Sequence, residues 1–331
     1  MPSLKSTVCK AITGIAALAS VFFTVDHASA QGDTYPTRAV RIVVPYATGG
    51  GSDILARQIG ASLQTIWGQG VVVDNKAGAA GNIGSLEVAR APADGYTLVL
   101  QNNTMITNLA VNGKLPYDAE KDLTPIMLLG VTPLALVAHP SLQVNNIKEL
   151  LALSKAKPDT LAYGSCGIGS PHHFAMELLK EKTGITAAHA GYKGCSPAVT
   201  DVLGGQIPLA VVSANLVVPH VKSGKLKVLG VTTPRRYSLL PDTPTFEEQG
   251  YKPFDLGNWF ALMGPGNLPP AVVKKIATDV EKVLADPAVQ NNLTLAGVEI
   301  TKGSAPELAK LIQADTVKFK QVAKSANIKP E

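Results

Sequence analysis

The chain has 331 residues, of which 46% are hydrophobic and 17% charged, and it contains 30 glycines, 23 prolines and 3 cysteines. This length and apolar content predict two domains with separate cores, and they exclude a disordered chain and a disulfide-rich miniprotein. The formal charge of +5 is spread along the chain without a Lys/Arg block, so nucleic acid is not an expected partner.

Residues 1–30 have the three-part layout of a secretory signal peptide. Lys5 and Lys10 give a basic start, residues 11–25 form an apolar run, and a small Ala-x-Ala motif ends at Ala30. The apolar run is shorter than the ~20 residues that a transmembrane helix needs. We therefore expect a signal peptide that is cleaved after Ala30 and a mature protein in the periplasm.

Two cysteines remain in the expected mature chain, Cys166 and Cys195, and each lies in a Gly/Ser-rich loop. Because an oxidising compartment permits disulfides, one interpretation is a bridge that closes a loop of about 30 residues and stabilises the fold by roughly 3–4 kcal/mol. The other interpretation is a catalytic cysteine with His172, His173 or His189 as its base. The sequence places no third, orienting group at a recognisable spacing, and both interpretations stay open at this point.

The first part of the mature chain alternates strand patterns with helical patterns. Leu55, Ile59, Leu63 and Ile66 recur at helical spacing and predict one amphipathic helix. Strands are expected at residues 40–44, 71–73 and 96–100, and a short helix at residues 83–90. Strand, glycine turn, helix, strand is the βαβ unit, whose repetition predicts a mostly parallel sheet with helices on both faces.

A second set of the same kind follows. Strands are expected at residues 134–138, 161–163, 209–212 and 227–231, and helices at residues 147–156, near Phe174 and near Val199. After a Pro/Thr-rich connector, a strand at residues 259–263 and two helices return, the last with a capping box at Ser304 and Glu307. We therefore expect an α/β protein of two domains, each a mostly parallel sheet flanked by helices. The first would comprise residues 31–127 and 255–331, and the second residues 128–254.

A Gly-rich turn followed by a polar residue and a helix occurs four times, and the expected N-caps are Ser52, Asn82, Ser170 and Ser196. A helix N-terminus carries unpaired N–H groups and about half a positive charge, which attracts anions. In parallel sheets these starts lie at the carboxyl ends of the strands, where doubly wound folds bind ligands. Every helix needs a start, so each turn alone is also consistent with a purely structural role.

Four further polar residues follow or precede these elements and could select a ligand: Asn102, Asn215, Tyr192 and Lys193. Asn and Tyr can donate hydrogen bonds to a carboxylate without forming a buried ion pair. Ordinary loop polarity explains each of them equally well. No dinucleotide, phosphate-loop or paired-acid motif is present, and the adjacent His172 and His173 do not have metal-ligand spacing. We expect neither a cofactor nor a metal.

These same segments resemble the Bug family, the extracytoplasmic solute receptors of tripartite tricarboxylate transporters. The resemblance is carried by residues 45–53 (PYATGGGSD), 78–84 (GAAGNIG), 93–98 (ADGYTL), 167–173 (GIGSPHH), 192–194 (YKG), 197–206 (PAVTDVLGGQ) and 241–248 (PDTPTFEE). It implies a two-domain periplasmic binding protein of the Venus-flytrap type, not an enzyme, that passes its solute to the membrane subunits of such a transporter. Cys166 and Cys195 depart from the family, which often has serine or another small residue there.

The resemblance also implies a small carboxylate ligand, either a di- or tricarboxylate or an aromatic acid, held by backbone N–H groups and hydroxyls on both domain faces. We expect a monomer, and a sensor kinase is an alternative reader of the loaded receptor. A periplasmic Cys/His hydrolase is the alternative of another class. Combining both lines of argument, the candidate ligand-binding residues are Thr48, Gly49, Gly50, Ser52, Asp53, Ala80, Gly81, Asn82, Asn102, Ser165, Cys166, Gly169, Ser170, His172, Tyr192, Lys193, Ser196 and Asn215.

Overall fold

The structure is a computed structural model that describes residues 35–158 and 160–330. The expected signal peptide and its cleavage site lie outside the described residues. One compact unit begins at Pro36 and contains both sheets described below. In the described part of the chain, no helix combines the length and the apolar character needed to cross a membrane.

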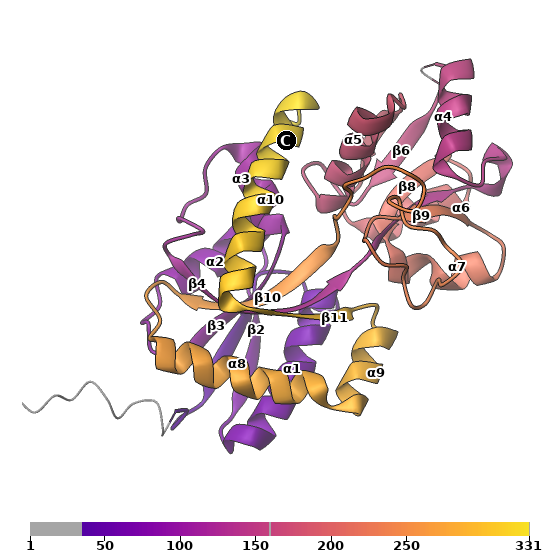
Figure 1. Ribbon diagram of the computed structural model, residues 1–331. Helices are drawn as coiled ribbons and strands as arrows, with labels where there is room; N and C mark the ends of the chain where they lie inside the picture. Colours follow the sequence, from indigo (N-terminus) through magenta and orange to yellow (C-terminus); the bar gives the residue numbers. More distant parts are fainter. Residues whose placement is uncertain (1–34, 159, 331) are drawn as a thin grey trace, which may run out of the picture. The chain divides into compact units, whose positions relative to one another are not determined.

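The first domain is built on a six-stranded sheet with the order β11-β4-β10-β3-β1-β2 (Figure 1). Its strands are β1 (Val40–Val44), β2 (Val71–Asn75), β3 (Thr97–Asn102), β4 (Leu123–Thr132), β10 (Asn258–Pro265) and β11 (Glu299–Ser304). β1 pairs in parallel with β2 and β3, whereas β10 runs antiparallel to β3 and β4, and β11 runs antiparallel to β4.

Helices cover both faces of this sheet because its strands are apolar on both sides. α1 (Gly51–Trp67) and α8 (Pro270–Ala285) lie on one face, and α2 (Asn82–Ala89), α3 (Thr104–Asn112) and α10 (Ala305–Ser325) lie on the other (Figure 1). Side chains alternate along a strand, so Val43 and Val99 belong to the same core cluster as Ile312 of α10. The shorter α9 (Pro287–Leu295) packs against α8.

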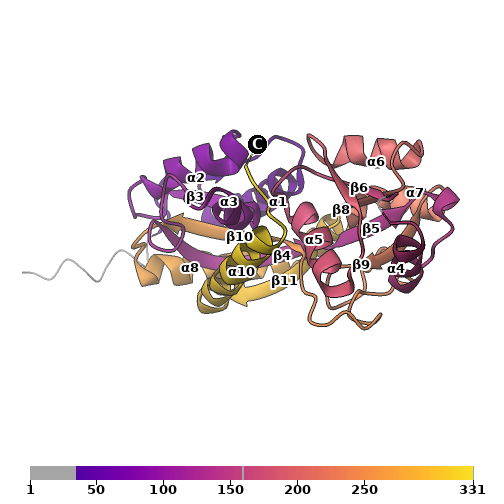
Figure 2. The same cartoon turned by 90° about the horizontal axis from the view of Figure 1, so that it is seen from above.

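The second domain is built on a five-stranded sheet with the order β7-β6-β8-β5-β9. Its strands are β5 (Leu134–Ala138), β6 (Ala162–Ser165), β7 (Ala188–Gly191), β8 (Leu209–Ser213) and β9 (Lys227–Val231), and its helices are α4 (Ile147–Ala156), α5 (Pro171–Thr183), α6 (Cys195–Leu203) and α7 (Val218–Lys222). Leu136 faces the α5 side with Phe174, whereas Val137 faces Val199 and Val202 of α6. Figure 2 shows α4 and α5 apart from α6.

The expected class, two α/β domains of the periplasmic binding protein type, is confirmed, but both sheets are mixed and not mostly parallel. The physical reason is the route of the chain between the domains. β4 ends at Thr132 and β5 begins at Leu134, so the chain leaves the first sheet and enters the second without a crossover helix. Because the chain leaves the first sheet along β4 and re-enters it along β10, these two neighbours run antiparallel, and β5, which carries the chain into the second sheet, runs antiparallel to β8 and β9.

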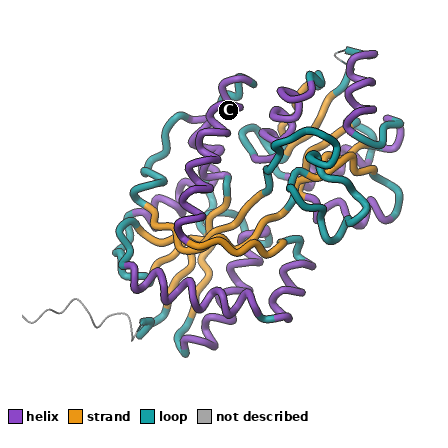
Figure 3. The backbone as a smooth tube through the Cα atoms, viewed as in Figure 1, coloured by secondary structure: helices purple, strands orange, loops and turns teal. Residues whose placement is uncertain are grey.

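The chain crosses between the two sheets at Pro133 and again in the segment from Thr232 to Gly257, which includes the long loops after β9 (Figure 3). The fully buried Thr232 joins these crossings: its Oγ1 accepts a hydrogen bond from Leu134 N at 3.2 Å and donates to Leu256 O. The boundary expected after residue 127 falls inside β4, which remains paired with β10 up to Thr132.

Candidate functional site

A cavity of about 510 Å³ is lined by residues of both domains, and we call it the interdomain cavity. It lies where the carboxyl ends of parallel strands meet the first turns of helices. Its lining residues are Tyr46, Ala47, Thr48, Gly49, Gly50, Gly51, Ser52, Ile54, Asn102, Thr132, Cys166, His172, Gly194, Cys195, Ser196, Ser213, Asn215, Leu216, Asn258, Phe260 and Ala296.

The first-domain wall of the cavity is the N-terminus of α1. Gly50 is the N-cap and no side chain caps the first turn, so the expected capping role of Ser52 is wrong. Ser52 instead lies inside the helix, and its Oγ accepts a hydrogen bond from Asn102 Nδ2 at 3.3 Å. The N–H groups of an uncapped first turn have no partner within the helix, which makes them donors to an anion.

The preceding loop is fixed by Asp53, whose carboxylate accepts a hydrogen bond from Gly49 N at 2.9 Å and pairs with Arg57 at 2.9 Å. Burial raises the pKa of Asp53, but the hydrogen bonds from Arg57, Gly49 and Asn75 outweigh it and hold that pKa below its ordinary value. Asp53 therefore stays ionised and holds the glycine loop. It does not line the cavity.

The second-domain wall is the N-terminus of α6, which begins at Cys195. Gly194 is the N-cap and again no side chain caps the turn, so the expectation that Ser196 is the N-cap is also wrong. Gly194 N donates to Cys166 O at 3.1 Å, which ties this helix start to the loop after β6. Each domain thus presents one helix start without a side-chain cap to the same cavity.

Cys166 and Cys195 form a disulfide, with their Cα atoms 4.2 Å apart. This resolves the alternative left open by the sequence, because a bridged sulfur is no nucleophile. The hydrolase interpretation, which needed a free thiolate, is therefore not supported. Of the three candidate bases, only His172 lies beside the sulfurs, with its Nε2 3.6 Å from Cys195 Sγ.

The described lining of the interdomain cavity contains no Lys, Arg, Asp or Glu. Burial lowers the pKa of His172 to about 3, so its imidazole is neutral at neutral pH and adds no charge. Its Nε2 lies 3.0 Å from Ser213 Oγ. The groups of the described lining that favour an anion are therefore the N-termini of α1 and α6, through their helix dipoles and oriented N–H groups.

The structure brings half of the predicted site residues to the interdomain cavity: Thr48, Gly49, Gly50, Ser52, Asn102, Cys166, His172, Ser196 and Asn215. Ala80, Asn82 and Gly169 line a separate cavity of about 640 Å³ that shares no lining residue with the first. Gly81 packs close to the ring of Tyr46, where a Cβ atom would lie 3.0 Å from it.

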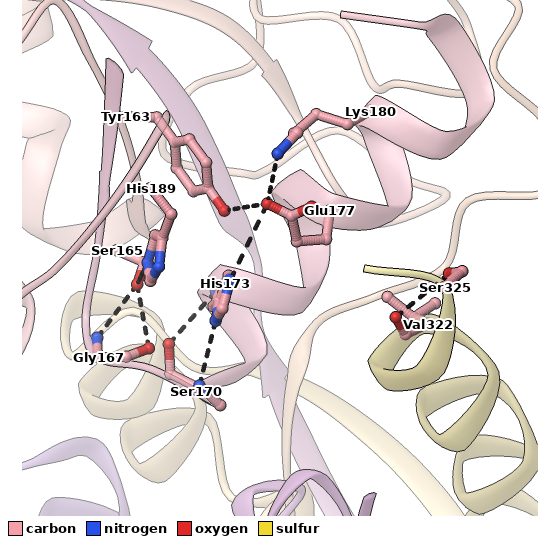
Figure 4. A network of polar contacts seen from close by, with 11 residues as sticks. Tyr163, Ser165, Gly167, Ser170, His173, Glu177, Lys180, His189, Val322 and Ser325 are labelled. Atoms are coloured by element: carbon pink, nitrogen blue, oxygen red, sulfur yellow. Dashed lines mark hydrogen bonds and ion pairs between the residues drawn. The ribbon is translucent and has the colours of Figure 1, made fainter. Parts of the chain in front are cut away.

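Two further predicted residues belong to a polar network behind the Cys166 loop (Figure 4). Ser165 Oγ lies 2.7 Å from His189 Nε2, and Ser170 caps α5 by accepting from His173 N, as expected from the sequence. The His173 and His189 rings stack with centroids 3.7 Å apart. This network shapes the loop and does not line the interdomain cavity.

The last two predicted residues also lie away from the cavity. Tyr192 donates its hydroxyl to Asp201 at 2.7 Å, so it fixes the loop to α6. Lys193 is exposed to solvent. Neither lines the interdomain cavity.

Sequence reasoning missed several lining residues, chiefly Thr132, Ser213, Asn258 and Phe260. Ser213 ends β8, a predicted strand, so the rule that placed Asn102 at a strand end would have found it, whereas β4, which ends at Thr132, was not itself predicted. Asn258 begins β10. Because β10 is antiparallel, its first residue lies at the same edge as the ends of its neighbours.

Two α/β domains, joined at Pro133 and by residues 232–257 and lining one cavity without charged side chains, define the class of two-domain solute-binding proteins. Residues 55–328 match the family described as "Tripartite tricarboxylate transporter family receptor". The chain belongs to this family of receptors. It is also related to Bug proteins, in sequence to BugT and in structure to BugD. Members of this family are periplasmic receptors for solutes and not enzymes.

The chain is similar to the protein BugT of Bordetella pertussis, with 36% identity over 264 residues, which cover 79% of this chain and 81% of BugT. It is similar to the solved structure of the periplasmic binding protein BugD, with 33% identity, a TM-score of 0.74 and coverage of 90% of this chain and 100% of that chain. A protein of R. palustris solved with adipate is 32% identical, with a TM-score of 0.77 and coverage of 90% and 100%.

Proposed function

We propose that this protein captures a small organic carboxylate in the interdomain cavity and delivers it to a tripartite tricarboxylate transporter. The observation that carries the proposal is the pair of helix starts at Gly51 and Cys195, one from each domain, that face the cavity without a side-chain cap. An anion that bridges these two helix starts favours the arrangement in which the domains close around it.

The walls between the helix starts favour a ligand with an apolar body. Ile54 and Leu216 line the cavity from opposite domains and are 39% and 36% exposed, and Phe260 also lines it. Covering such side chains stabilises a complex through the hydrophobic effect. The adipate in the R. palustris structure, which is an aliphatic dicarboxylate, supports this class of ligand.

We propose that contact with the ligand is made by the predicted residues Thr48, Gly49, Gly50, Ser52, Asn102, Ser196 and Asn215, with Ser213 and Asn258 added from the structure. Asp53 and Tyr192 do not contact the ligand in this proposal. They position it indirectly, because their hydrogen bonds hold the loops in place.

Differential scanning fluorimetry against a library of aliphatic and aromatic acids tests the proposed ligand class. A ligand that binds only the folded protein must raise its melting temperature. We expect a shift with at least one acid and none with the matching amide, which has the same shape without the charge. A shift with neutral sugars or peptides but with no acid would contradict the proposal.

We further propose that the mature protein begins at Gln31 and is monomeric. The first point rests on the Ala-x-Ala motif that ends at Ala30, and mass spectrometry of the exported protein tests it. Light scattering at several concentrations tests the second. We propose no catalytic activity. Incubation with the bound acid followed by its quantitative recovery tests this point, because an enzyme would consume it.

We propose that the junctions between the domains lie at Pro133 and between Thr232 and Gly257. We also propose that the membrane subunits of the transporter recognise and bind the closed form. Uptake of the labelled acid by cells that lack those subunits separates transport from signalling through a sensor kinase. Transport predicts that uptake is lost, whereas a pure signalling role predicts that it is unchanged.

A further inference from the structure

Three groups that can bind a metal meet at the second-domain wall of the interdomain cavity. The sulfurs of Cys166 and Cys195 and a ring nitrogen of His172 all lie within 4.8 Å of one another. They come from three different segments, namely the loop after β6, the start of α6 and the start of α5. In the disulfide form the two sulfurs bind each other, so the group is not available to a cation.

We infer that, once the disulfide is reduced, Cys166, Cys195 and His172 form a binding site for a thiophilic cation such as Zn²⁺. Tetrahedral zinc has Zn–S distances of about 2.3 Å and Zn–N distances of about 2.1 Å, which places sulfur and nitrogen about 3.6 Å apart. Cys195 Sγ and His172 Nε2 are 3.6 Å apart. Cys195 Sγ and His172 Nε2 therefore already have the spacing of two zinc ligands. Rotation of the Cys166 side chain brings its Sγ into the third ligand position.

The site does not depend on the disulfide for its assembly. Gly194 N donates to Cys166 O at 3.1 Å and Tyr192 N donates to Ser165 O at 3.1 Å, so two backbone hydrogen bonds hold the cysteine loops together. His172 is buried in the second-domain wall, and its Nε2, which lies 3.0 Å from Ser213 Oγ, exchanges this contact for the cation on binding. Because all three ligands line the cavity, the fourth coordination position faces the space where we propose that the carboxylate binds.

The reduction needs a dithiol. One thiolate of the dithiol attacks Cys166 Sγ, and Cys195 leaves as a thiolate. The second thiol of the reductant then attacks the mixed disulfide, which releases Cys166 and leaves the reductant as a cyclic disulfide. Two electrons pass to the cysteine pair, and the two sulfurs bind the cation as thiolates while their protons go to solvent. Both cysteines are half-buried at the cavity wall, where a small dithiol can reach them.

Titration with Co²⁺, used as a spectroscopic substitute for Zn²⁺, tests the inference. The full chain is reduced with a dithiol, freed of reductant without oxygen and titrated in a buffer that contains no carboxylate. We expect thiolate-to-cobalt charge-transfer absorption that saturates at one equivalent and is displaced by Zn²⁺. The oxidised protein should give none. The result does not depend on the proposed carboxylate function, which is measured separately on the oxidised protein.

Three variants make the test specific. H172Q should weaken Co²⁺ binding by about 10-fold or more, since even the loss of an outer-shell partner costs that much. C166S should abolish the charge-transfer band of a dithiolate while leaving the buried His172 in place, and circular dichroism checks that each variant is folded. H220Q, which changes a histidine outside the cavity, should bind as the unaltered protein does. Absence of the band in the reduced protein, or equal affinity of H172Q and H220Q, would overturn the inference.

Discussion

Asn215 donates its Nδ2 hydrogen to the carbonyl oxygen of Ala296 at 3.2 Å, and this bond links the second domain to the first beside the interdomain cavity. Asn215 follows β8 and Ala296 lies between α9 and β11. The pair therefore favours the arrangement in which both domains line the cavity.

The first prediction concerns this link. Replacing Asn215 with Ala removes this hydrogen bond, worth about 0.5–1.5 kcal/mol, together with the proposed contact of the same side chain with the ligand, so the dissociation constant of a bound acid should rise by at least roughly 2- to 10-fold. Isothermal titration calorimetry measures this change. Asn291→Ala, the same change at an exposed position of α9, is the control and should bind normally. Equal affinity of the two variants would show that the link plays no part in binding.

The second prediction concerns Asp53, which holds the glycine loop at the start of α1. Its pKa lies below the ordinary 3.8, so its ion pair with Arg57 stabilises the fold above about pH 4 and is lost as the pH falls through the lowered value. Asp53→Asn should therefore reduce the free energy of unfolding at pH 7, and the difference from the unaltered protein should narrow below pH 4. Urea unfolding across this pH range measures the effect. Asp242→Asn, at an exposed position, should cost nothing at either pH.

The third prediction concerns the packing of α10 against α5. The rings of Phe319 and Phe174 meet edge to face with centroids 5.1 Å apart, and Phe319 is only 1% exposed. Phe319→Ala should lower the free energy of unfolding by about 3–5 kcal/mol, as is typical of buried Phe to Ala changes. Val317→Ala on the same helix is the control, because Val317 is 70% exposed. A loss no larger than that of the control would mean that this contact does not stabilise the fold.

The fourth prediction concerns the disulfide, whose cysteines are 29 residues apart. Replacing Cys166 and Cys195 together with Ser should reduce the stability by roughly 3–4 kcal/mol, since the unfolded chain regains the freedom that the closed loop removes. Denaturant unfolding under non-reducing conditions measures the difference. Stability equal to that of the oxidised protein would argue against the bridge.

Local pattern was enough to predict several strands. The runs at Val40–Val44, Leu134–Ala138 and Lys227–Val231 form strands with the predicted bounds, because short apolar segments between turns have few alternatives. β4 escaped prediction, since Pro125 and Gly130 interrupt its pattern while its pairing with β10 overrides both. The mostly parallel sheets were predicted from the local strand–helix–strand pattern. The direction of β10 and β5 is set instead by partners that are distant in sequence, which a local pattern does not reveal.

The candidate site was predictable where one residue acts alone and less so where loops must meet. Ser170 and Ser304 cap their helices as their local sequences predict. Ser52, Asn82 and Ser196 do not, because glycine takes the N-cap position at all three helices. The distinction between the interdomain cavity and the separate cavity at Ala80 depends on how the loops pack, and no local pattern encodes it.

The central claim is that a carboxylate binds at the uncapped start of α1. A Cβ atom at Gly51 would lie 3.1 Å from the Phe260 ring, so a valine there intrudes on the cavity wall. Calorimetry with the acid that gives the largest thermal shift should detect binding to the unaltered protein and to Gly204→Val, whose glycine is exposed and lies outside the cavity. Gly51→Val should bind no acid, and unchanged affinity in that variant would contradict carboxylate binding at this helix start.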